Sequence, residues 1–233
     1  MSVQGNPFSI HDSSLVLYLD AANIKSYIGS GTAWVDLSGN SINGTLVNTP
    51  SFNTGSGGNF VFNGSNTHII SAENSTLNTQ TPSVEVWIKT NSTNQNGFFF
   101  EKGNVNTQYS LFQENTTIVW RQNVNVGGFD TVTSMTVTTA TYISTSQWAH
   151  IVGTFQNGDR RLYINGVLVN SDTQAGTIAT NANGISIGVY GGFNGGRGYY
   201  YNGSIGIVKV YNKVLSQSDV LQNYNTVKPR FGL

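Results

Sequence analysis

Apolar and polar residues alternate in many short runs of this chain, and turn-forming pairs rich in Asn and Gly separate the runs. An alternation with a period of two predicts strands, because successive side chains of a strand point to opposite faces. The runs are Leu15–Leu19, Phe60–Phe62, Val84–Lys89, Thr117–Arg121, Ile151–Phe155, Leu162–Ile164, Ile185–Ile187 and Ile205–Tyr211. The pair Asn165-Gly166 separates two such runs and predicts a two-residue hairpin. Many short strands joined by hairpins predict an all-β, antiparallel sandwich.

One segment near the C-terminus has the signals of a helix. Ser216 and Asp219 are spaced as a capping pair, and Val220, Leu221 and Tyr224 share a helical face. We expect a short C-terminal helix of about a turn and a half, packed on the edge of the sandwich.

The chain shows no boundary between domains. Residues 14–225 are expected to form one domain, flanked by an N-terminal arm at residues 1–13 and a C-terminal arm at residues 226–233. Within the domain, the stretch Gln122–Gln147 is rich in Thr, Val and Ser and is predicted to hold a long hairpin.

Composition excludes several classes of function. The 233 residues include 11 basic and 11 acidic groups, so the net charge is zero and we expect neither nucleic acid nor an anionic membrane as a partner. The chain has no cysteine, which excludes thiolate metal sites and disulfides. Aromatic residues make up 12% of the chain and argue against disorder. No apolar run is long enough to span a membrane, and we expect no cleavable secretion signal at the start.

Several phrases, taken in order, resemble the laminin-G-like branch of the concanavalin A-like lectin/glucanase superfamily. They are Leu15–Asp20, Trp34–Asn40 with Gly44–Leu46, Phe60–Gly64, Ser83–Lys89, Trp148–Phe155 leading into Leu162–Gly166, and Asn202–Asn212 with Leu215-Ser216. The resemblance implies a two-sheet jelly roll whose first and last strands lie close together. Gly206 departs from the pattern, since many relatives carry an acidic residue there.

In style the chain is most similar to single-domain proteins of tailed-phage virions, which open from Met and close with a tail like residues 223–233 here. This similarity implies a protein made in the host cytoplasm, displayed on the virion surface, and held as an oligomer or on a lattice by other capsid or tail proteins. Phe8 and residues 229–233 are the expected anchors in the two arms.

The superfamily includes glycanases, so the acidic residues need to be considered. Retaining glycanases hold two carboxylates about 5 Å apart in the cleft. No two acidic residues of this chain are two positions apart, so no single strand presents such a pair. A pair between strands, such as Glu85 with Glu101, is the arrangement left open. We expect a protein that is not an enzyme.

A calcium site is the one cofactor site that the sequence leaves open, and we expect no cofactor to be required. The resemblance implies Ca²⁺ at the rim of the sandwich, where Asp36 and Asn40 lie in a tight loop and Asp20 ends the first strand. Their oxygens are the ligands that calcium prefers. The alternative is an Asx-type turn, in which Asp36 bonds to its own backbone.

The alternation also predicts a face that could bind a ligand. Glu85 and Trp87 point away from the core side of their strand, as do Arg161 and Tyr163 of another strand, and His150 points away from Ile151. If these strands are neighbours, the five side chains line one surface with the aromatic and polar mixture that suits sugars. The alternative is a second small core covered by a loop or by the Gln122–Gln147 hairpin.

A second candidate is the glycine-rich loop at residues 190–201, which carries Tyr190, Phe193, Arg197 and Tyr199. Tyr and Arg among glycines are typical of contact surfaces. The alternative is that alternate tyrosines simply begin the last strand.

Three functions follow from this sequence. We expect a non-catalytic surface protein of a tailed-phage virion, as a capsid decoration or tail-fibre component, with glycan binding as an added activity. The alternative is a free carbohydrate-binding lectin assisted by Ca²⁺. A glycanase is the third.

Overall fold

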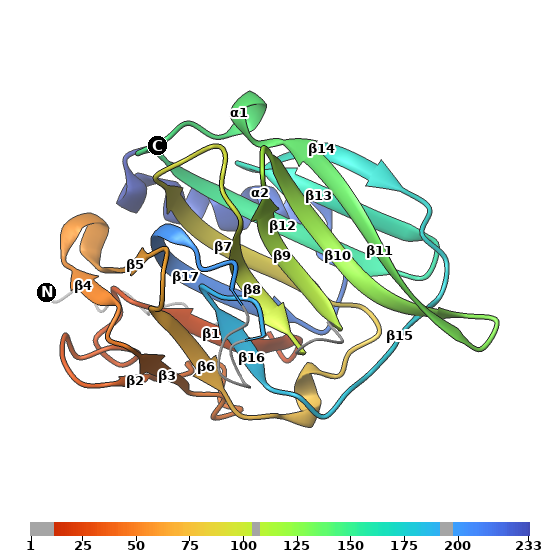
Figure 1. Cartoon of the computed structure of the whole chain (residues 1–233), viewed down its shortest axis with the longest axis horizontal. Coiled ribbons are helices and arrows are strands. Elements are labelled where there is room, and N and C mark those ends of the chain that lie inside the picture. Colours follow the sequence, from red (N-terminus) through yellow and green to blue (C-terminus); the bar gives the residue numbers. More distant parts are fainter. Residues whose placement is uncertain (1–11, 104–107, 192–197) are drawn as a thin grey trace, which may run out of the picture.

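The computed structural model describes residues 12–103, 108–191 and 198–233, which fold into two antiparallel β-sheets packed face to face (Figure 1). Sheet A has the order β14-β13-β12-β7-β17-β5-β4, with β1 also paired to β17. Its strands are β1 (Leu15–Asp20), β4 (Ser51–Asn53), β5 (Asn59–Asn63), β7 (Ser83–Thr90), β12 (Trp148–Gln156), β13 (Asp159–Ile164), β14 (Val167–Asp172) and β17 (Asn202–Tyr211).

Sheet B has the order β11-β10-β9-β8-β16-β6-β3-β2, with β15 also paired to β10. Its strands are β2 (Ala33–Trp34), β3 (Gly44–Val47), β6 (His68–Ser71), β8 (Gly97–Lys102), β9 (Tyr109–Glu114), β10 (Thr117–Val126), β11 (Phe129–Thr138), β15 (Thr177–Ile178) and β16 (Ile185–Ile187). Short helical turns, α1 (Thr139–Tyr142), η1 (Gly55–Gly57) and η2 (Ser75–Leu77), connect some of the strands.

The predicted sandwich is confirmed, and each alternating run forms a strand. Asn165 and Gly166 connect β13 to β14 with φ angles of 51° and 79°, the left-handed conformation that a two-residue hairpin of this kind needs. The first and last strands pair, as the family resemblance implies, with Tyr18 opposite Lys209. The main core lies between the sheets and includes Trp34, Phe60, Trp120 and Ile205, each fully buried.

The C-terminal helix is longer than predicted, and it lies in a different place. α2 (Gln217–Val227) has 11 residues and continues into the 3-10 helix η4 (Lys228–Phe231). Ser216 and Asp219 form the predicted capping box. Figure 1 shows α2 behind sheet A, on the face turned away from sheet B, and not at the sandwich edge. Among the described residues, no helix has the length and apolar character that a membrane crossing requires.

The structure differs from the sequence prediction in the bounds of the long hairpin and in the C-terminal arm. The long hairpin consists of β10 and β11 and turns at Gly127-Gly128, so it begins before Gln122 and ends at Thr138. The C-terminal residues do not form a free arm, because Phe231 is buried against sheet A and Arg230 bonds to Asp20 at 2.6 Å. The N-terminal anchor proposed at Phe8 lies outside the described residues.

Candidate functional site

The outer face of sheet A brings together the first set of predicted site residues. β12 lies between β7 and β13, with His150 opposite Trp87 and Val152 opposite both Glu85 and Tyr163. The face assignments made from the alternation are therefore correct, because these strands are neighbours and their registers align.

That face is nevertheless covered, and the prediction that it is an open surface is wrong. Glu85, Trp87, His150 and Tyr163 are each 0% exposed. Side chains of α2 and η4 pack on them and bury a second set of apolar groups, which includes Val220 and Phe231. The arrangement is the second small core of the alternative interpretation, but the C-terminal helix supplies its cover. Arg161 stays partly exposed and bonds to Asp159 at 2.8 Å.

Glu85 organises the polar part of this buried layer. Its carboxylate accepts hydrogen bonds from Lys209 Nζ at 3.1 Å, Asn223 Nδ2 at 2.7 Å and the Tyr211 hydroxyl at 3.3 Å. His150 Nε2 lies 3.3 Å from the same carboxylate. Burial alone would raise the pKa of Glu85, but Lys209 and His150 outweigh it and hold the pKa well below its ordinary value.

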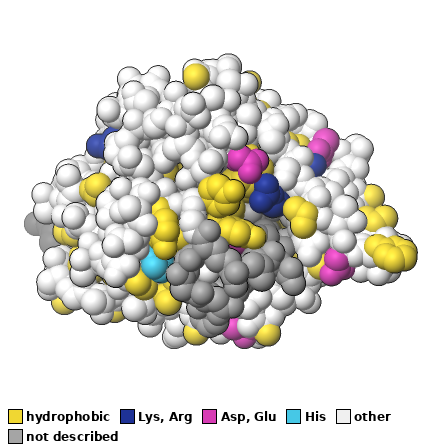
Figure 2. Space-filling view, viewed as in Figure 1, with side chains coloured by type: hydrophobic (Ala, Val, Ile, Leu, Met, Phe, Trp, Pro, Cys, Tyr) yellow, Lys and Arg dark blue, Asp and Glu magenta, His cyan; other side chains and the backbone are white. Residues whose placement is uncertain are grey.

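The second set of predicted residues leads to an aromatic groove on the outer face of sheet B. Phe98 of β8 stacks on its cross-strand partner Phe112 of β9, with ring centroids 4.2 Å apart and planes within 4°. Tyr190 and Tyr199 lean over this pair, with centroids 5.1 Å and 6.5 Å from that of Phe98. In Figure 2 these hydrophobic side chains form a yellow patch near the centre of the face.

Polar groups border the aromatic rings. The Arg121 guanidinium lies 4.4 Å over the Phe112 ring, donates to Ser134 at 3.2 Å, and stands 3.9 Å from Glu114. In Figure 2, dark-blue and magenta side chains lie beside the yellow patch. Asn96 and Gln113 also line the hollow, which has a volume of about 270 Å³.

The loop positions Tyr199 above the groove. Backbone bonds join Tyr199 O to Phe98 N at 3.3 Å and Gly198 O to Tyr190 N at 3.3 Å. Tyr199 has a φ angle of 53°, which is uncommon for a residue with a side chain, and half of its surface is exposed. Phe193 and Arg197, predicted with it, lie outside the described residues.

The groove residues of the strands were not predicted, although the sequence carries a signal for some of them. In the run Thr117–Arg121 the core residues Ile118 and Trp120 place Val119 and Arg121 on the outer face. The outward direction of Phe98 could not be predicted in this way. A bulge between Phe98 and Phe100 interrupts the alternation, so that both Phe99 and Phe100 point into the core.

The carboxylates of the proposed calcium site are hydrogen-bonded within the chain. The Asp36 carboxylate accepts hydrogen bonds from the backbone of Tyr18, Ser38 and Ile42, and from the Ser38 hydroxyl. Arg230 and Tyr18 bond to the Asp20 carboxylate. Asn40 donates its side-chain amide to Val16 O and Ser38 Oγ. With both carboxylates already accepting hydrogen bonds, the geometry favours the Asx-type turn at Asp36. Among the described residues, no group of three or more His, Asp or Glu side chains converges on a point.

The remaining carboxylate pair also fails to form. Glu85 lies in sheet A and Glu101 in sheet B, and both are fully buried. Glu101 accepts a hydrogen bond from the backbone of Gly191 at 2.7 Å, so it supports the loop beside the groove. These two glutamates therefore do not reproduce the carboxylate geometry of a glycanase.

The fold and the sequence together define the family. Residues 62–221 match the sequence profile described as the Concanavalin A-like lectin/glucanases superfamily. The chain belongs to this superfamily. No curated protein matches the chain.

Solved structures show the same fold at low sequence identity. The receptor-binding domain of botulinum neurotoxin C/D mosaic serotype matches with a TM-score of 0.70 and 22% identity, over 92% of this chain and 51% of that one. The binding domain of Paraclostridial Mosquitocidal Protein 1 matches with a TM-score of 0.70 and 21% identity, over 93% and 53%.

A third similar structure is the binding domain of botulinum neurotoxin DC in complex with SialylT. It has a TM-score of 0.70 and 17% identity, over 94% of this chain and 52% of that one. The chain thus spans about half the length of these structures.

Proposed function

We propose that this chain is a non-catalytic carbohydrate-binding domain, and that the aromatic groove over β8–β10 is its glycan site. The observation that carries the proposal is the stacked pair Phe98–Phe112, overhung by Tyr190 and the exposed ring of Tyr199. Aromatic rings bind the apolar faces of sugar rings, and a buried base of two stacked phenylalanines holds the outer rings in place.

The polar border supplies the other half of sugar recognition. Arg121 is held by the Phe112 ring, by Ser134 and by Glu114, so its guanidinium presents donors at a fixed position. A guanidinium and a carboxylate together can bond to hydroxyl groups as donor and acceptor. Because the two charges offset each other, the groove suits a neutral glycan.

The comparisons support a binding role. All three similar structures are named as binding domains, two of them of botulinum neurotoxins, and one of these two was solved with SialylT. The separation of Glu85 and Glu101 into different sheets supports a role without catalysis.

A glycan array with and without EDTA tests this proposal. We expect binding that resists EDTA, because the rim carboxylates are already hydrogen-bonded, and that weakens roughly tenfold in Tyr199→Ala. A blank array, or equal binding by wild type and Tyr199→Ala, would overturn the assignment to the groove. Binding abolished by EDTA would instead restore the Ca²⁺-assisted lectin.

We also propose that the domain works on the surface of a tailed-phage virion, bound to other capsid or tail proteins. The support is the sequence similarity to single-domain virion proteins. Residues 226–233 pack on their own sheet, so attachment in this proposal uses other parts of the chain. Antibodies against the domain should label intact purified particles in negative-stain micrographs. Particles without label, and without the chain by mass spectrometry, would contradict this placement.

A further inference from the structure

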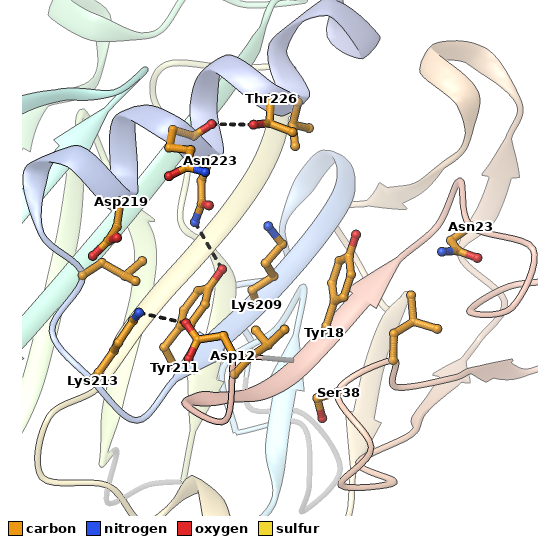
Figure 3. A pocket seen from close by; sticks show the side chains of 15 residues that line it. Asp12, Tyr18, Asn23, Ser38, Lys209, Tyr211, Lys213, Asp219, Asn223 and Thr226 are labelled. Atoms are coloured by element: carbon orange, nitrogen blue, oxygen red, sulfur yellow. Dashed lines mark hydrogen bonds and ion pairs between the residues drawn. The ribbon is translucent and has the colours of Figure 1, made fainter. Parts of the chain in front are cut away.

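A second hollow lies on the opposite side of the molecule, between α2 and β1. It has a volume of about 450 Å³, within the range of small-molecule sites, and the strand β17 forms its floor. Figure 3 shows Lys209 and Tyr18 pointing into this space, and Asn223 pointing from α2 toward Tyr211. We call it the α2–β1 crevice.

The polar groups at the floor of the crevice are held rigidly. Glu85, behind the floor, bonds to Lys209, Tyr211 and Asn223, which come from β17 and α2. A buried ion pair of this kind adds little net stability compared with apolar packing, so stability alone does not account for it. Its effect is to fix an ammonium, a phenol and an amide at one place.

Two of these groups keep unused hydrogen-bonding capacity. Lys209 Nζ donates to Glu85 and lies 5.2 Å over the Tyr18 ring, and among the described residues it has no other hydrogen-bond acceptor. Asn223 gives its amide protons to Glu85 and Tyr211, while its side-chain oxygen accepts no hydrogen bond from the described part of the chain. The crevice therefore offers ammonium donors and an amide acceptor to the same ligand.

Both lysines at the crevice are paired with a carboxylate. Lys209 pairs with Glu85 at 3.1 Å, and Lys213 pairs with Asp12 at 2.8 Å. Asp219 accepts the backbone proton of Ser216 at the start of α2. A ligand with a net charge would gain little here, whereas a hydroxyl group can both accept from the ammonium and donate to the amide oxygen. The walls of the crevice are formed by the rings of Tyr18 and Tyr211 and by apolar side chains. The apolar side chains are those of Leu15, Leu37, Leu215 and Val227.

We propose that the α2–β1 crevice is a binding site for a neutral polyhydroxylated ring compound of the size of one sugar unit. It is separate from the groove over β8–β10, and neither site depends on the other. The two lie on opposite sheets, so a chain with both would hold two sugar units at once.

An NMR titration tests the crevice directly. The ¹⁵N-labelled chain is titrated with glucose, galactose, mannose and N-acetylglucosamine, each to about 50 mM, because a shallow neutral site of this size gives millimolar affinity. We expect at least one sugar to shift the amide signals of Tyr18, Lys209 and Asn223. No shift at these residues with any of the four sugars would overturn the proposal.

Variants on α2 separate the crevice from the rest of the molecule. Thr226 and Gln222 line the crevice and are exposed, so Thr226→Phe fills it without touching the Glu85 network. It should weaken binding by at least about tenfold. Asn225→Phe, on the same helix but outside the crevice lining, is the matched control and should bind as wild type.

Gln222→Trp serves as a second filling variant in case Thr226→Phe does not fold. Equal affinity in wild type and a folded filling variant would refute the crevice assignment. Tyr199→Ala should leave the shifts at Tyr18, Lys209 and Asn223 unchanged, so failure of the groove proposal and failure of this one can be told apart.

Discussion

The ring of Phe231 stacks on the indole of Trp87, with centroids 4.5 Å apart and planes within 19°. The Phe231 ring also packs against Trp148, with the two ring centroids 4.4 Å apart. The two tryptophans lie on neighbouring strands of sheet A, and the third residue from the C-terminus closes over both. This contact turns a face with the chemistry of a sugar site into a buried layer.

Removal of this ring should destabilise the fold. Phe231→Ala is expected to lower the free energy of unfolding by about 2–4 kcal/mol, because it opens a cavity over both indoles. Urea titration gives this value, and a red shift of tryptophan emission should accompany it. Leu233→Ala is the control, since Leu233 is 42% exposed and should change stability by less than about 0.5 kcal/mol. Equal stability of the two variants would show that Phe231 does not close this layer.

Gly206 makes room for the same ring. A Cβ atom at Gly206 would lie 3.0 Å from Phe231 Cζ and 3.1 Å from Cε1. Gly206→Asp should therefore displace η4 and cost about 1–3 kcal/mol. The cost should shrink when Phe231→Ala is already present, because the clash is gone. Additive effects in this double-mutant cycle would contradict the steric explanation.

Because of Lys102, the free energy of unfolding should depend on pH above pH 7. Burial lowers the pKa of its ammonium from 10.5 to about 8, and its Nζ donates to the carbonyls of Asn181 and Asn183. Between about pH 8 and 10.5 the unfolded chain holds this proton and the folded chain has lost it, so stability rises with pH across that window. The rise should reach at most about 3 kcal/mol.

Urea titrations at pH 7 and pH 10 measure this effect. Lys102→Met carries no titratable group at that position, so the contribution of Lys102 is the part of the wild-type change that the variant lacks. Identical pH dependence in both proteins would mean that the folded chain does not depress this pKa.

Replacing Tyr199 should lower glycan affinity and leave the free energy of unfolding nearly unchanged. Half of its surface is exposed, so Tyr199→Ala is expected to weaken glycan binding roughly tenfold, the effect of losing one stacking ring. Unfolding curves should stay within about 0.5 kcal/mol of wild type. Phe129→Ala is the matched control, because Phe129 is a more exposed aromatic residue at the tip of the β10–β11 hairpin. A loss of binding in the Phe129 variant instead would move the site to that hairpin.

Local patterns in the sequence were enough to predict the strands at the eight alternating runs, the hairpin at Asn165-Gly166, the capping of α2 and the direction in which each alternating residue points. These features are local, because side-chain direction in a strand follows from the period of two and a turn follows from its own φ angles. The directions of Trp87 and of His150 relative to the core could therefore be predicted, but only the pairing of β7 with β12 brings the two onto one face.

The tertiary structure alone decided what covers that face and where an open aromatic surface remains. Alternation tells which way Trp87 points, but only long-range packing brings Phe231 and α2 across it. The groove joins Phe98, Phe112, Arg121 and Tyr199 from separate strands and a loop, and its base depends on a bulge that breaks the period. A local pattern carries no information about contacts between residues so far apart in the chain, because pairing and packing select them only in the folded molecule.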